Sequence, residues 1–156
     1  MPALPIVLSK TLKLTNVLIA TMGAEDFTNL DKFAYQMENY IKSKGFQPIG
    51  PLVQYINVQP SENGEPELAV RMLRQANGFI NHTEPPYTME SVLRIPSCLY
   101  LRFIGPQDKL NIAYSKLTVY AYEEDIPLTG NNYTVFVNQL ENEDIVADVF
   151  MEKAHE

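Results

Sequence analysis

The sequence predicts an α+β fold in which one β-α-β-β unit occurs twice. Several short segments alternate apolar and polar residues, which is the period of a strand, and two longer segments place apolar residues three and four apart, which is the period of a helix. Several tyrosine, proline and glycine residues of the first half also recur in the second half, each at nearly the same distance along the sequence. Because a unit of about 75 residues is too small to bury both faces of a sheet alone, we expect two units to complete one domain over residues 1–156.

The first unit opens with a strand and a helix. We expect residues 1–10 to form a loosely held lead-in, followed by a strand over residues 12–20. Residues 30–41 repeat apolar side chains at helical spacing, and Gly45 is suited to end that helix because glycine readily adopts the left-handed conformation at helix C-termini.

Two strands joined by a hairpin complete the first unit. Residues 48–51 contain two prolines and a glycine and read as a turn before a strand over residues 52–58. Asn63 and Gly64 form a strong hairpin signal, and residues 67–75 alternate as a returning strand.

The second half repeats this order after a linker. We expect a strand interrupted at Pro96, then a helix, a strand, a short turn and a last strand, over residues 89–103, 110–120, 133–137, 138–144 and 145–151. Matching residues of the halves lie 79 to 82 positions apart: Tyr35 and Tyr114 (79), Pro48 and Pro127 (79), Gly50 and Gly130 (80), Gly23 and Gly105 (82).

This repetition predicts the domain organisation. Repeat one covers about residues 11–77, the linker about 78–87 and repeat two about 88–153. We expect pseudo-twofold symmetry, an antiparallel sheet with helices on one side, and a groove between the halves. Ligands prefer such concave places between half-domains. Nine tyrosines and no tryptophan favour a groove that offers stacking surfaces and hydroxyl groups.

Composition disfavours several other classes of function. The net charge is −7, which disfavours a nucleic-acid partner because phosphate binding depends on concentrated lysine and arginine. Cys98 is the single cysteine, so the chain has no internal disulfide and no cysteine-based metal site, and we expect Cys98 to be a core residue. The apolar run Ala3–Leu8 is too short for a signal peptide and no segment spans a membrane, so we expect a cytoplasmic protein.

The motifs of the second half resemble those of the GyrI-like family, the effector-binding domains of multidrug-responsive bacterial transcription activators. The resemblance covers about residues 12–151 and implies a tandem β-α-β-β repeat with a ligand groove. Its pieces stand in the family's order: Arg94-Ile95-Pro96, Gly105-Pro106, Leu110, Ala113-Tyr114, Leu117, Tyr120, Gly130, Tyr133 and Phe136.

Two positions depart from the family pattern. Gln107 follows Gly105-Pro106 where the family has an aromatic residue, and Thr134 stands where family members commonly carry a pocket glutamate. A buried carboxylate suits an organic cation, whereas threonine offers only a hydrogen bond. We therefore favour a neutral or amphipathic ligand, unless Glu90 or Asp148 supplies the charge.

The resemblance implies a small-molecule-binding module for transcription regulation or multidrug sensing, and we expect it to be free-standing. No helix-turn-helix pattern is present, so a DNA-binding partner is expected to be another chain. We expect no catalytic residue, cofactor or metal, and six ligand-lining residues: Tyr55, Tyr100, Tyr114, Tyr133, Thr134 and Phe136.

Two alternatives remain open. Some GyrI-like relatives are hydrolases, and a general base here would have to be Glu90, Asp148, His82 or a tyrosine; His82 is expected to be an exposed linker residue. The other alternative is an inhibitor or interaction module that binds a separate regulator or target protein, with the acidic residues 123–125 as its feature.

Overall fold

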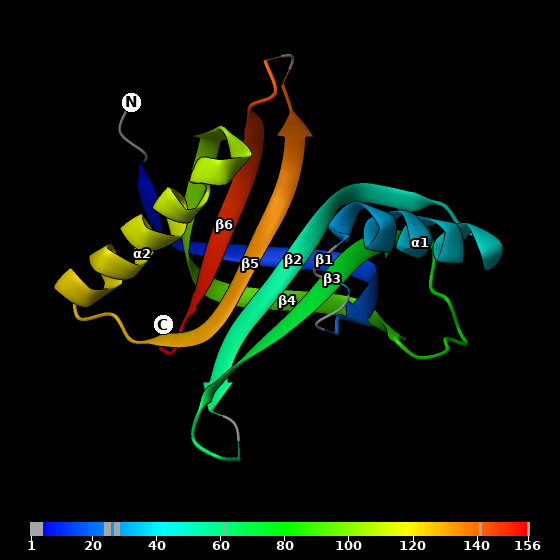
Figure 1. The fold of residues 1–156 in the computed structure, drawn as a ribbon, viewed down its shortest axis with the longest axis horizontal. Helices are drawn as coiled ribbons and strands as arrows, with labels where there is room; N and C mark the ends of the chain where they lie inside the picture. Colours follow the sequence, from blue (N-terminus) through cyan, green and yellow to red (C-terminus); the bar gives the residue numbers. More distant parts are fainter. Residues whose placement is uncertain (1–4, 24–25, 27–28, 61, 141, 156) are drawn as a thin grey trace. The chain divides into compact units, whose positions relative to one another are not determined.

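The structure is a computed structural model that describes residues 5–23, 26, 29–60, 62–140 and 142–155. Figure 1 shows its elements, which follow one another along the chain as β1 (Ile6–Thr21), α1 (Leu30–Ser43), β2 (Pro48–Pro60), β3 (Pro66–Ala76), β4 (Tyr87–Gly105), the short 3-10 helix η2 (Gln107–Lys109), α2 (Asn111–Glu123), β5 (Leu128–Gln139) and β6 (Ile145–Lys153). The chain divides into two compact units, Lys13–Arg94 and Met1–Leu12 with Ile95–Glu156.

In the unit Lys13–Arg94, β3 is the central strand. It pairs antiparallel with β1 on one side and with β2 on the other. Helix α1 lies along β2 and β3 (Figure 1). The helix begins after Asn29, whose side chain accepts the backbone N–H of Lys32. Its buried side chains Phe33, Met37 and Ile41 join apolar residues of β1 and β3 in the core of this unit.

In the other unit, β6 is the central strand. It pairs antiparallel with β4 and with β5. Helix α2 lies along β6 (Figure 1), and its buried side chains are Ala113, Leu117 and Ala121. They pack on buried residues of β4 and β6: Leu99, Leu101, Phe103, Ile145, Ala147, Val149 and Met151.

The predicted α+β class is confirmed, with antiparallel strand pairs and one α-helix in each unit. The expected strands, both helices and the hairpin at Asn63-Gly64 are all present, and Gly45 lies just after α1 at a φ of 88°. Among the described residues, no helix combines the length and the apolar character needed to cross a membrane.

Three expected boundaries were wrong. Residues 6–10 belong to β1 rather than to a loose lead-in. Residues 48–51, expected as a turn, begin β2, where the pairing with β3 is irregular between Ile49 and Val53. Prolines are tolerated at the start of a strand and at such irregularities because no ladder hydrogen bond from their nitrogen is needed there. At Pro96 the strand continues, although Ser97 has a φ of 57° and the pairing of β4 with β6 begins at Cys98.

The two units share one element order, strand-helix-strand-strand, and one pairing pattern. Gly50 and Gly130, 80 residues apart, both have positive φ. The buried helix residues also match at an offset of 80, since Phe33, Met37 and Ile41 correspond to Ala113, Leu117 and Ala121. Tyr35 and Tyr114, which the sequence matched, are 79 positions apart. Tyr35 is exposed and Tyr114 is half-buried, so this pair is one residue away from the offset of 80 that the buried helix residues share. The repeat boundaries, the pseudo-twofold symmetry and the groove between the halves stay predictions.

Substitution of Met37 tests whether the packing of α1 on the strands stabilises the unit Lys13–Arg94. The side chain of Met37 is fully buried, so Met37→Ala removes apolar contacts and leaves a cavity. We expect the free energy of unfolding to fall by about 2–5 kcal/mol, measured by urea denaturation. The matched control is Gln36→Ala, an exposed neighbour on the same helix, which we expect to change it by no more than about 0.5 kcal/mol. Equal effects of both substitutions would contradict this account of the core.

Candidate functional site

Strand β6 separates two environments because successive side chains point to opposite faces. Ala147, Val149 and Met151 face α2 and belong to the core of the unit. Asp148 and Phe150 therefore point to the opposite face, which we call the helix-free face of β4, β6 and β5. This face is the candidate functional site.

Aromatic side chains form a row across the helix-free face. Phe150 on β6 lies directly opposite Tyr100 on β4 and Tyr133 on β5 in the strand register. All three are buried, and the ring centroids of Tyr100 and Phe150 are 5.0 Å apart at an interplanar angle of 54°. Tilted aromatic pairs of this kind are favourable contacts that add to the burial of apolar area.

Asp148 is one of two carboxylates that the alternation of β6 places on this face; the other, Glu152, lies opposite Cys98 and accepts from Thr129 and Asn131. The register places Asp148 opposite Arg102 on β4, and the Arg102 guanidinium donates to both oxygens of Asp148, Nε to Oδ1 at 2.7 Å and Nη2 to Oδ2 at 3.0 Å. The Tyr100 hydroxyl donates to Oδ1 at 2.7 Å. Burial alone would raise the pKa of Asp148, but the hydrogen bonds from Arg102 and Tyr100 outweigh it and hold this pKa below its ordinary value. The side chain of Asp148 is 14% exposed and that of Arg102 is 49% exposed, so solvent reaches the pair from the arginine side.

A second cation lies at the same cluster. The Lys10 ammonium sits 4.0 Å from the centroid of the Tyr100 ring, a distance at which a cation is attracted to the aromatic face. Burial, followed by the hydrogen bond to Asp148, raises the pKa of Tyr100, so its hydroxyl stays protonated at neutral pH. Lys10, Arg102 and Asp148 together carry one net positive charge.

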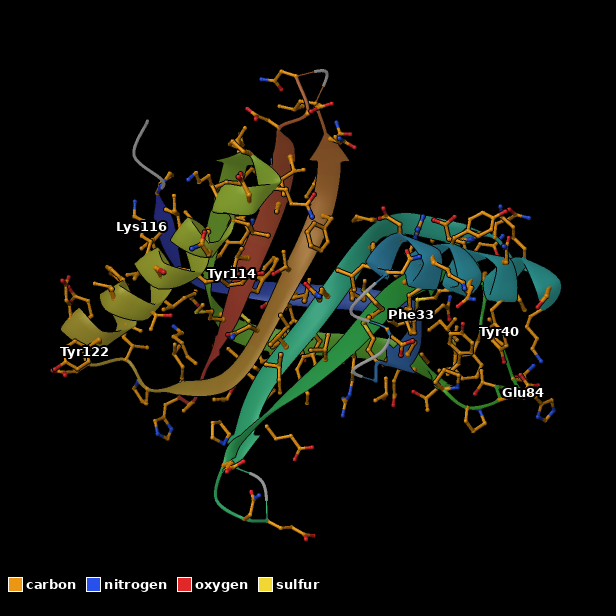
Figure 2. All side chains as sticks on the ribbon, viewed as in Figure 1. Phe33, Tyr40, Glu84, Tyr114, Lys116 and Tyr122 are labelled. Carbon is orange, nitrogen blue, oxygen red and sulfur yellow. The ribbon has the colours of Figure 1, made fainter. Side chains whose placement is uncertain are left out.

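The other face of the sheet holds Thr134. Thr134 is buried, and its hydroxyl is hydrogen-bonded to the hydroxyl of Tyr114 on α2. Figure 2 shows Tyr114 on the side of α2 that faces the sheet. Burial raises the pKa of Tyr114 more strongly than the bond to Thr134 lowers it. Phe136, two residues along β5, packs against the core of the unit, so Thr134 and Phe136 share one face as predicted.

The structure thus divides the six residues predicted to line a ligand. Tyr100 and Tyr133 lie in one row on the helix-free face, whereas Tyr114, Thr134 and Phe136 lie between sheet and helix. Tyr55 is buried on β2 in the other unit, with the Arg71 guanidinium 5.2 Å from its ring centroid.

Sequence reasoning missed Arg102, Lys10 and Phe150. The alternation of Tyr100 and Arg102 with apolar residues on β4 was a usable signal, because it places both on one face. Of the two carboxylates considered as a charge source, Glu90 is exposed on β4 and Asp148 is largely buried.

Cys98 is a buried thiol, and His82 and His155 lie at exposed positions. Cys98 is fully buried, as expected of a core residue, and burial raises the pKa of its thiol to about 11. His82 is exposed in the segment before β4. Within the part of the chain that the structure describes, no group of three histidine, cysteine, aspartate or glutamate side chains is placed to hold a metal ion.

Comparisons with known proteins find likeness in structure. By sequence, the chain matches no family model and no curated protein. By structure, it is similar to EcmrR in a complex with DNA (TM-score 0.68, 16% identity), over 94% of this chain and 57% of that one. It is also similar to the EcmrR C-terminal domain (TM-score 0.59, 15% identity, 97% and 95% covered). A third similar structure is SAV2435 bound to tetraphenylphosphonium (TM-score 0.54, 9% identity, 99% and 95% covered).

At these identities the comparisons establish the fold. The chain has the fold of the EcmrR C-terminal domain, and the resemblance to GyrI-like effector-binding domains is confirmed at this level. It spans 57% of the length of the EcmrR chain in the DNA complex.

The Asp148 cluster makes stability depend on acid pH. Because the folded chain holds the pKa of Asp148 below its unfolded value, the unfolded state binds the proton more tightly. The contribution of Asp148 is complete above its unfolded pKa of about 3.9 and is lost as the pH falls through the folded pKa. We expect Asp148→Asn to be less stable at pH 7 and to lose less stability on acidification, measured by urea unfolding from pH 7 to pH 3. Asp108→Asn, at an exposed position, should keep the native acid dependence; the same acid dependence in Asp148→Asn would contradict the assignment.

The thiol of Cys98 should be unreactive in the folded chain. Its burial and its raised pKa leave little accessible thiolate at pH 8. We expect a colorimetric disulfide reagent to modify less than about 5% of the chain in one hour under native conditions and nearly all of it in concentrated urea. In Ser115→Cys, the thiol added at this exposed position should react under both conditions. Rapid modification of Cys98 under native conditions would contradict the burial of its thiol.

Proposed function

We propose that this chain binds a hydrophobic or amphipathic small molecule and serves as an effector-binding module in transcription regulation. The observation that carries the proposal is the helix-free face, where tyrosine and phenylalanine rings adjoin a hydrogen-bonded carboxylate, inside a fold that EcmrR and SAV2435 also have. SAV2435 is bound to tetraphenylphosphonium and EcmrR is in a complex with DNA, which supports ligand binding linked to regulation.

Tyr100 and Tyr133 are the residues that we propose to contact the ligand. Both are aromatic, both lie in the row around Phe150, and a ring can stack on a flat ligand while its hydroxyl orients it. The other predicted lining residues stay predictions: Tyr55, Tyr114, Thr134 and Phe136. A separate regulator or target protein as partner, the placement of a DNA-binding segment on another chain, and a cytoplasmic location also stay predictions.

The charges of the face favour a neutral or amphipathic ligand over a lipophilic cation. The carboxylate of Asp148 already accepts two hydrogen bonds from Arg102 and one from Tyr100. A cation would have to displace Arg102, and the nearby Lys10 would repel it. At the family position of the pocket glutamate, Thr134 is buried and bonded to Tyr114, so it provides no negative charge there either.

A ligand panel tests the proposal through thermal stability. A molecule that binds only the native state raises the melting temperature. We expect triphenylphosphine oxide, which is neutral, to stabilise the chain more than tetraphenylphosphonium at equal concentration. Tyr133→Ala should abolish that shift, whereas Tyr35→Ala, at a position 65% exposed on α1, should retain it. No shift with any neutral or charged amphiphile of the panel would overturn the proposed function.

Arg102→Gln tests the role of charge compensation. The substitution removes the guanidinium partner of Asp148 and leaves a carboxylate that a cation can pair with. We expect the affinity for tetraphenylphosphonium, measured by calorimetry, to rise about three- to tenfold, a modest gain because the pair is partly exposed. The control Lys109→Gln removes one positive charge from an exposed position of the same unit and should leave the affinity unchanged. Equal gains in both variants would mean that only the overall charge matters.

A further inference from the structure

The outward face of α2 carries apolar side chains that lie opposite its core face. Ile112, Val119 and Tyr122 are 37%, 53% and 85% exposed. Helix α1 also exposes apolar side chains, Leu30 at 38% and Tyr35 at 65%, beside polar residues such as Gln36. Figure 2 shows Lys116 and Tyr122 on the side of α2 away from the sheet. A helix that is apolar on both faces is typical of one that packs on both faces.

A cleft accompanies this face. It has a volume of about 430 Å³ and lies between α2 and the start of β1. Its apolar wall includes Ile6, Ile112 and Val119, and Lys116 and Glu123 contribute one positive and one negative group. All of these residues belong to one unit of the chain.

A twofold rotation can place the positive group of the cleft in one copy opposite the negative group of the cleft in a second copy. Lys116 and Glu123 are seven residues apart, which is about two helical turns, so they lie on one stripe together with Val119. If two copies of α2 pack antiparallel and cross at Val119 and Tyr120, Lys116 of each copy lies opposite Glu123 of the other. The same contact brings the two Val119 side chains together and covers the apolar wall.

We propose that the outward face of α2, with the adjoining cleft, is the interface of a symmetric homodimer. A twofold interface uses the same patch on both copies and must therefore be self-complementary, in shape as in charge. The stripe of Lys116, Val119 and Glu123 meets the charge requirement, because its two ends carry opposite charges. The helix-free face lies on the opposite side of the same sheet, so the dimer is independent of the proposed ligand site.

Charge reversal in two separate variants tests the interface. Lys116→Glu gives two negative groups on the stripe and Glu123→Lys gives two positive ones, so each variant repels its own copy. A mixture of the two variants restores both opposite-charge contacts. By sedimentation equilibrium we expect the native chain to form dimers, each variant alone to dissociate with a dissociation constant at least about tenfold higher, and the equimolar mixture to form dimers again.

Controls separate the interface from folding and from other contacts. Lys32→Glu reverses an exposed charge on α1 and should leave the native dimer unchanged. Circular dichroism and the melting temperature should show that both α2 variants fold. The proposal is overturned by a native chain that stays monomeric throughout the concentration range, by a dimer that neither reversal weakens, or by variants that remain monomeric when mixed.

Discussion

The alternation of side chains along β6 is the constraint on which the functional interpretation depends. Because β6 pairs with both β4 and β5, its register decides which face each of their side chains occupies. Val149 faces α2 and completes the core, and its neighbours Asp148 and Phe150 consequently build the helix-free face. A slip of one residue would bury the carboxylate beneath the helix and expose the core residue, which is why burial of the α2 contact also fixes the candidate site.

This chain differs from the pattern of the GyrI-like family, which it resembles, in where its acidic side chain lies. That pattern has a pocket glutamate at the position of Thr134, which in this chain lies on the face covered by α2. Here Thr134 and Tyr114 satisfy each other's hydroxyl groups, and the acidic group is Asp148 on the neighbouring strand and the opposite face. Its charge is balanced by Arg102. The chemistry available to a ligand beside Asp148 is therefore aromatic contact and hydrogen bonding, because the charge of that carboxylate is already paired.

The fold could be predicted further than the site. Local periods identified all strands and both helices, and Gly50 and Gly130, which were matched in sequence, both have positive φ. The site was predicted only in part. Tyr100, Tyr133 and Asp148 were named individually, but their common face follows from strand pairings that join Phe150 to Tyr133, 17 positions away, and to Tyr100, 50 positions away. A single sequence does not reveal such a register.

The sequence by itself determined the class of fold, the order of elements, the burial of Cys98 and the hairpin at Asn63-Gly64, because these depend on short-range sterics and on the period of apolar residues. Only the tertiary structure decided that Thr134 bonds Tyr114, that Arg102 and Tyr100 hold Asp148, and that α2 presents apolar groups on its outward face. These outcomes depend on which strands pair and how a helix rotates on its sheet. Both are set by the packing of distant side chains, which no local pattern records.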